Sequence, residues 1–103
     1  MYMVRRWWGE QTRNLSPDGF ENVILEVRSA GEEHLCASLT HESEWALSFY
    51  RDGLLVFENV EDTDAPPRHL RDVGIGDTVS YWSLLAVGDL TALERLPWLP
   101  GYG

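Results

Sequence analysis

The sequence contains a single cysteine, no lysine and no long hydrophobic run, and each absence narrows what the protein can be. Cys36 has no partner for an internal disulfide, which excludes a disulfide-stapled secreted scaffold. No apolar run approaches the ~20 residues that a transmembrane helix needs. Residues 1–8 hold two arginines without the apolar run of a secretory signal. We therefore expect a cytoplasmic protein.

The charge balance is strongly acidic. Seventeen acidic residues face eight basic ones, and the formal net charge is −9. A surface of this sign repels phosphate backbones and anionic membranes, because binding to either depends on lysine and arginine. It attracts and steers a basic protein. We therefore expect a basic protein partner rather than a nucleic acid or a membrane; the oligomeric state is left open.

The length and patterning predict one α+β domain that spans residues 1–103. Alternating residues predict strands over residues 2–8, 22–29, 34–40, 45–50 and 54–59, and Asp52-Gly53 between the last two is a strong hairpin signal. Asp77 is predicted to cap a helix that runs to about Val87, with Gly88 as the residue after its end. Asp89 is predicted to cap a shorter helix over residues 90–96. The order favours an antiparallel sheet of about four to five strands, with a C-terminal helical unit packed on one face. The tail, residues 97–103, is expected to pack back on the body.

His34, Cys36 and His41 are the first candidates for chemistry. A structural zinc site needs four good ligands, usually in closely spaced pairs, and this chain has one cysteine. A nucleophilic cysteine needs an electropositive setting, whereas the acidic neighbours of Cys36 would raise its pKa. We therefore predict no catalytic residue, no metal and no cofactor. A small enzyme, or a ligand- or metal-binding domain with a pocket near these residues and His69, is the alternative.

Two further motifs have ordinary structural explanations. The Gly74-Ile75-Gly76-Asp77 segment lacks the third glycine of a dinucleotide fingerprint and the lysine of a P-loop, so we expect a tight turn before a helix. Trp7 and Trp8 are adjacent, and adjacent strand residues point to opposite faces. They cannot both be buried under one face of the sheet.

An acidic segment follows the predicted hairpin. Calcium is disfavoured because the segment lacks the ligand spacing of an EF-hand, and a paired-carboxylate glycosidase is disfavoured by the small size of the chain. A solvated loop is the simplest interpretation. The functional interpretation is a recognition loop, stiffened by Pro66-Pro67, that docks onto a cationic cleft. The partner-binding residues of that loop are Glu58, Glu61, Asp62 and Asp64.

In size, acidity and layout the whole chain resembles the immunity proteins of bacterial polymorphic toxins. No diagnostic motif of those proteins is matched residue by residue, so the resemblance assigns no site. It implies a small cytoplasmic inhibitor without catalytic activity that blocks the active cleft of a toxin acting on nucleic acids. The four carboxylates above are chosen from charge alone.

Overall fold

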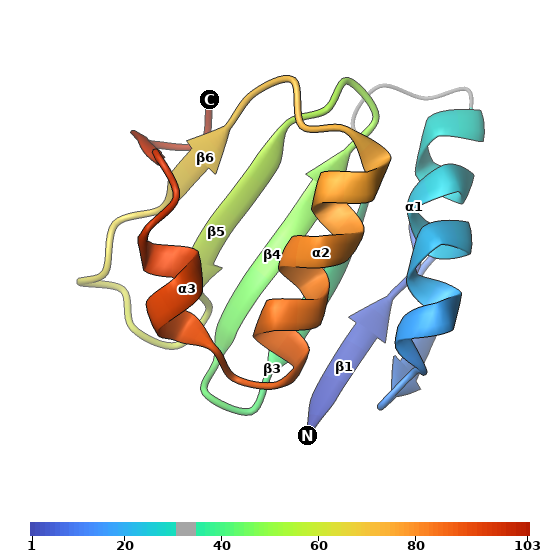
Figure 1. Ribbon diagram of the computed structural model, residues 1–103, viewed down its shortest axis with the longest axis horizontal. Helices are drawn as coiled ribbons and strands as arrows, with labels where there is room; N and C mark the ends of the chain where they lie inside the picture. The colour runs from blue at the N-terminus through green and yellow to red at the C-terminus, as the bar shows by residue number, and fades with distance from the viewer. Residues whose placement is uncertain (31–34) are drawn as a thin grey trace.

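The computed structural model (Figure 1) describes residues 1–30 and 35–103, which form both strands and helices. The strands are β1 (Tyr2–Arg5), β2 (Gln11–Arg13), β3 (Cys36–His41), β4 (Trp45–Tyr50), β5 (Leu55–Asn59), β6 (Arg68–Leu70) and β7 (Leu99–Pro100). The helices are the 3-10 turn η1 (Pro17–Gly19), α1 (Phe20–Ser29), α2 (Ile75–Ala86) and α3 (Leu90–Glu94).

The hairpin of β4 and β5 is confirmed. Gly53 in its turn has φ +87°, a conformation that glycine adopts without the steric cost that a Cβ would impose. Leu47 pairs with Phe57, and Phe49 pairs with Leu55. These four large apolar residues therefore share one face of the sheet, as their alternation predicts.

The strands form one antiparallel sheet in the order β2-β1-β3-β4-β5-β6-β7. Figure 1 shows α1, α2 and α3 on the same side of this sheet. The predicted α+β class and antiparallel sheet are confirmed, but the sheet has seven strands rather than four or five. The strands β2, β6 and β7 are only two or three residues long, too short to leave a readable alternation in the sequence.

Residues 22–29 were predicted to form a strand, and that prediction is wrong, because they belong to helix α1. The side chains of Phe20, Val23, Ile24 and Val27 are 0% exposed, and their spacing of three and four places them on one face of a helix. β-branched residues favour strands when isolated. Here the burial of a complete helical stripe against the sheet outweighs that preference.

Helix α2 begins earlier than predicted. Its N-cap is Gly74, and Asp77 lies inside the first turn, so the prediction of Asp77 as the cap is wrong. The hydroxyl group of Thr78 donates a hydrogen bond of 2.9 Å to the carbonyl oxygen of Gly74. Ile75 packs against the core, and this apolar contact extends the helix through a segment whose glycines predicted a break.

The end of α2 and the start of α3 agree with the prediction. Gly88 has φ +75°, and its N–H group donates to the carbonyl oxygen of Leu85 while that of Asp89 donates to Leu84. This pair of bonds is a Schellman motif, which satisfies the last carbonyl groups of a helix. The carboxylate of Asp89 then accepts the N–H group of Ala92 and caps α3.

The sheet has one apolar face and one mixed face. The residues of β3, β4 and β5 that point to the helices are almost fully buried: Ala37, Leu39, Leu47, Phe49, Leu55 and Phe57. Their neighbours point the other way, to a side that none of the described helices covers, which we call the helix-free face. On β3 to β5 it presents Cys36, Ser38, Thr40, Ala46, Ser48, Tyr50, Val56 and Glu58.

The C-terminal segment packs on the body, as predicted. The ring of Trp98 stacks on Phe57 with centroids 5.0 Å apart, and its indole N–H donates to the carbonyl oxygen of Leu93 over 2.8 Å. After β7 the chain reaches the helix-free face. There the hydroxyl group of Tyr102 donates a hydrogen bond of 2.7 Å to Glu58.

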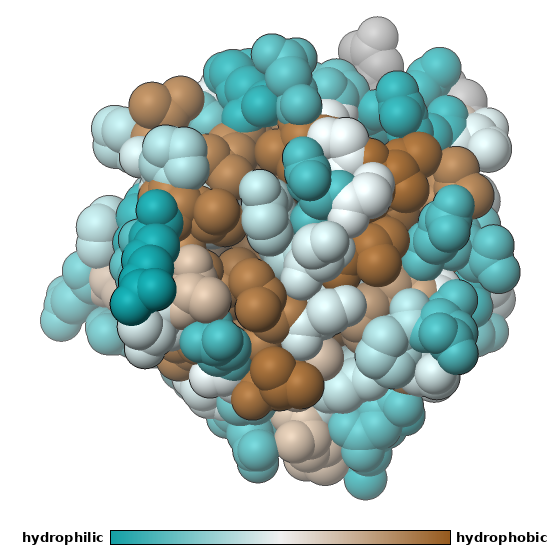
Figure 2. Space-filling model, viewed as in Figure 1, coloured by the Kyte–Doolittle hydropathy of each residue, from teal (hydrophilic) through white to brown (hydrophobic). Residues whose placement is uncertain are grey.

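Figure 2 shows the helix side as a space-filling surface. Apolar residues are visible along and between the helices, and hydrophilic residues occupy much of the rim. None of the helices in the described part of the chain has the length and apolar character that a bilayer crossing requires.

Candidate functional site: the acidic end of the sheet

Two acidic segments far apart in the sequence lie side by side at one end of the sheet. The N–H group of Val60 donates a hydrogen bond of 2.9 Å to the carbonyl oxygen of Glu44, which joins the β3–β4 turn to the loop after β5. The two joined segments carry six carboxylates, and we call this group the acidic end. Its members are Glu42, Glu44, Glu58, Glu61, Asp62 and Asp64.

The loop after β5 is held by side-chain hydrogen bonds. The amide oxygen of Asn59 accepts the N–H groups of Glu61 and Asp62 over 3.0 and 2.8 Å. The carboxylate of Asp62 accepts the N–H group of Asp64 over 3.0 Å. The side chains of Glu61, Asp62 and Asp64 are exposed, so these three charges face solvent on an ordered backbone.

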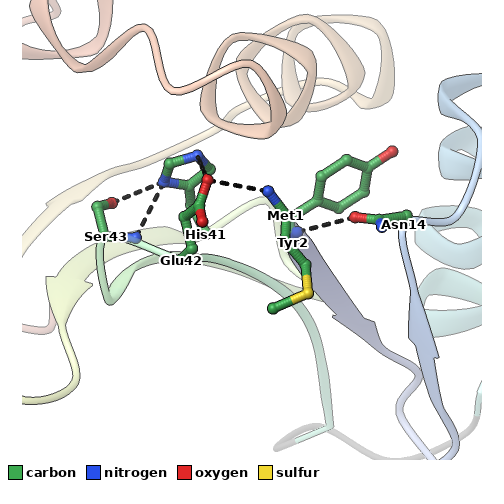
Figure 3. A network of polar contacts seen from close by, with 6 residues as sticks. All are labelled: Met1, Tyr2, Asn14, His41, Glu42 and Ser43. Atoms are coloured by element: carbon green, nitrogen blue, oxygen red, sulfur yellow. Dashed lines mark hydrogen bonds and ion pairs between the residues drawn. The ribbon is translucent and has the colours of Figure 1, made fainter.

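Glu42 is the member of the acidic end whose charge is neutralised nearby. The amino nitrogen of Met1 lies 3.0 Å from its carboxylate and donates a hydrogen bond to it (Figure 3). This bond lowers the pKa of Glu42. Nε2 of His41 is 3.9 Å from the same carboxylate, while Nδ1 accepts the backbone N–H of Ser43.

The other five carboxylates form no ion pair with any residue that the structure describes. Arg13 lines a small hollow of about 170 Å³ together with Glu42 and Glu44, but it does not reach either carboxylate. The acidic end therefore presents a concentrated negative charge with little internal compensation.

Glu44 has an unusual backbone conformation. Its φ is +73°, in the left-handed region where a side chain crowds the backbone and glycine is favoured. A carboxylate therefore occupies a position at which glycine would cost less.

Glu58 connects the acidic end to a groove on the helix-free face. The groove has a volume of about 280 Å³. It exists because the central strands β3 and β4 contribute small side chains at this position. These residues form its floor: Ser38, Thr40, Ala46 and Ser48.

Longer side chains from the strands on either side of β3 and β4 form the two walls of the groove. Met3, Arg5 and Gln11 on β1 and β2 form one wall, and Glu58 and Val60, on and just after β5, form the other. Arg5 forms no ion pair with the described residues, so one wall is positively charged and the other negatively charged. The negative wall continues directly into the acidic end.

Cys36 and His41 do not come together. They are five positions apart on β3, and strand residues at odd separations point to opposite faces, so Cys36 lies on the helix-free face and His41 on the helix face. Burial raises the pKa of the Cys36 thiol, which keeps it protonated. Among residues 1–30 and 35–103, no group of three histidine, cysteine or acidic side chains is arranged to hold a metal ion. His34 lies outside the described residues.

Two other groups singled out from the sequence also have defined places. His69 is 6% exposed, and its Nδ1 lies 3.0 Å from the carbonyl oxygen of Gly101, so it fixes the tail to β6. Strand β1 ends at Arg5, earlier than predicted, and Trp7 and Trp8 lie in the following turn with 37% and 55% exposure. Both tryptophans therefore reach solvent.

Sequence reasoning brought Glu58, Glu61, Asp62 and Asp64 into one candidate site but missed the contribution of the β3–β4 turn. Glu42 and Glu44 join the others only through the pairing of β4 with β5. It predicted that Pro66-Pro67 stiffen the loop but did not predict the hydrogen bonds by which Asn59 holds its start. An asparagine before an acidic run is a turn signal that could have identified this role.

Comparisons with protein-family models, with curated proteins and with solved structures found no match to this chain.

Proposed function

We propose that this protein binds and neutralises a basic protein, and that it acts as an immunity protein in the bacterial cytoplasm by blocking the active cleft of a toxin that attacks nucleic acids. The observation that carries the proposal is the acidic end, where five carboxylates lack ion-pair partners among the described residues. Clefts that bind nucleic acids are positively charged, because they must neutralise phosphates. An ordered acidic surface is complementary to such a cleft.

The arrangement of the charges suits inhibition. Asn59 holds the backbone that carries Glu61 and Asp62, so less conformational entropy is lost when a partner binds. The strong net charge of −9 raises the rate of encounter with a cationic partner. Fast association is useful to an inhibitor that must bind its target before damage occurs.

The alternative of a small enzyme or metal-binding domain gains no support from the positions of Cys36 and His41, which lie on opposite faces of the sheet. The high pKa of the Cys36 thiol disfavours it as a nucleophile.

The first test is affinity capture at low salt from an extract of the native cells, with the purified chain as bait and elution by salt. A single basic protein that is released at moderate salt and identified by mass spectrometry would support the proposal. Its nuclease or deaminase activity on nucleic acid should then fall when the chain is added.

A charge-reversal pair tests the acidic loop. In the captured complex, Glu61→Lys with Asp64→Lys should weaken binding and slow association most at low salt, because both side chains are exposed. The matched control is Asp18→Lys with Glu21→Lys, two exposed acids near the start of α1. Each substitution of an acid by lysine changes the net charge by +2, so each pair of substitutions changes it from −9 to −5. Equal effects of the two pairs would remove the loop from the interface.

A further inference from the structure

The groove on the helix-free face has the width of an extended chain segment. Its walls are contributed mainly by β1 and β5, which are three strands apart in the sheet. At the usual spacing of strands, their backbones are about 14 Å apart. The side chains of the two walls narrow this space further. The remaining width fits an extended peptide but not a whole helix, whose diameter with side chains is about 10–12 Å.

The lining of the groove suits a long basic side chain. Ser38, Thr40 and Ser48 offer hydroxyl groups on the floor, which can accept hydrogen bonds from a guanidinium or ammonium group. Met3 and Val60 offer apolar surface against which the aliphatic stem of such a side chain can pack. Glu58 supplies the carboxylate, and Tyr102 bonds only one of its oxygens.

The opposite charges of the two walls favour one orientation. A basic side chain is attracted to Glu58 and repelled by Arg5, so it is directed to the wall that continues into the acidic end. A second copy of the chain is a poor occupant, because both copies would carry a net charge of −9.

We infer that the groove receives an extended segment of the basic partner, with one arginine or lysine side chain bound between Glu58 and the hydroxyl floor. This inference rests on the proposed function and adds a second point of contact beyond the acidic loop. The partner is thereby held across one end of the helix-free face as well as at the loop.

The test uses a capped Gly-Arg-Gly peptide as the probe and amide NMR shifts of the intact chain as the readout, at low salt. The peptide should produce saturable shifts at Ser38, Ser48 and Glu58, and its citrulline counterpart, which lacks the charge, should not. Glu58→Gln should weaken the apparent affinity about fivefold, the effect of losing one exposed ion pair. The matched control Glu21→Gln should leave it unchanged.

A second variant guards against indirect effects of Glu58→Gln. Ser48→Tyr fills the floor without changing the charge and should abolish the shifts at Ser38 if the peptide enters the groove. Equal shifts with the citrulline peptide, or shifts confined to residues 61–64, would overturn the inference. Glu58→Gln binding the peptide as well as the wild type would overturn it too.

Failure here is distinguishable from failure of the proposed function. If reversal of Glu61 and Asp64 releases the captured partner but the arginine peptide shifts no groove residue, the inference fails and the proposed function stands. If the peptide occupies the groove but the captured partner is indifferent to the loop reversal, the acidic loop is excluded from the interface.

Discussion

Replacing Glu44 by glycine should stabilise the protein while weakening its binding to a basic partner. The residue has φ +73°, and holding an L-residue in the left-handed region costs about 1–2 kcal/mol. Glycine removes that cost but loses about 0.5–1 kcal/mol more backbone entropy on folding. The net gain in the free energy of unfolding is therefore about 0.5–1 kcal/mol.

The matched control is Glu44→Gln, which removes the same charge and keeps the strained backbone. Two backbone bonds are retained in both variants, because the N–H group of residue 44 donates to His41 over 2.9 Å and its carbonyl accepts from Val60 over 2.9 Å. The difference in stability between the two variants thus isolates the conformational cost. In a domain of this size it corresponds to a rise of about 2–8 °C in Tm.

Urea and thermal unfolding of the wild type and both variants measure the stability, and titration of the captured basic protein measures the binding. We expect glycine above glutamine in stability, and the two variants equally weakened in binding. If the glycine variant is no more stable than the glutamine variant, the conformational argument is refuted. If glutamine binds the partner as tightly as the wild type, Glu44 is outside the interface.

Four further outcomes check other parts of the structure. Asn59→Ala should speed amide hydrogen exchange at Glu61 and Asp62 and lower stability by ~1 kcal/mol. Asn59→Asp, which keeps the acceptor oxygen, should not speed that exchange. In urea unfolding, Gly88→Ala should lower the free energy of unfolding by ~1 kcal/mol or more, because its φ is +75° and a Cβ would lie 3.2 Å from the ring of His41. Gly76→Ala should raise the free energy of unfolding by up to ~1 kcal/mol, because Gly76 lies within α2 and a Cβ there would meet no neighbour. Burial raises the pKa of the Cys36 thiol, so at pH 8 it should react with iodoacetamide more slowly than a free thiol and should reach the free-thiol rate in urea. A native protein that reacts as fast as a free thiol would contradict the burial of Cys36. A hydrogen bond from Arg68 lowers the pKa of Glu94. The ionised carboxylate therefore stabilises the fold at pH values above its ordinary pKa, and that contribution is lost as the pH falls through the lowered pKa. The Tm deficit of Glu94→Gln should be present at pH 7 and shrink below about pH 4.

Local chemistry was enough to predict several elements of the fold from the sequence. The turn at Gly53, the helix end at Gly88 and the cap at Asp89 depend on conformations or hydrogen bonds that neighbouring residues settle among themselves. The α+β class and the apolar face of the central hairpin followed from the alternation of residues along the strands. The acidic run from Glu58 to Asp64 was also visible in the sequence, because its charges are close in the chain.

The tertiary structure decided the features that depend on contacts between distant segments. Residues 22–29 form a helix because a stripe that includes Val23 and Val27 is buried against the sheet. The helical spacing of that stripe is present in the sequence, but its burial, which outweighs the strand preference of β-branched residues, depends on the sheet. The strands β2, β6 and β7 are too short to be defined without the neighbours that they pair with. Strand pairing also brought Glu44 beside the loop after β5 and formed the groove next to Glu58, and it directed Cys36 and His41 to opposite faces. The register of paired strands determines which side chains meet across the sheet, and the residue types along one segment do not encode the segment it will pair with.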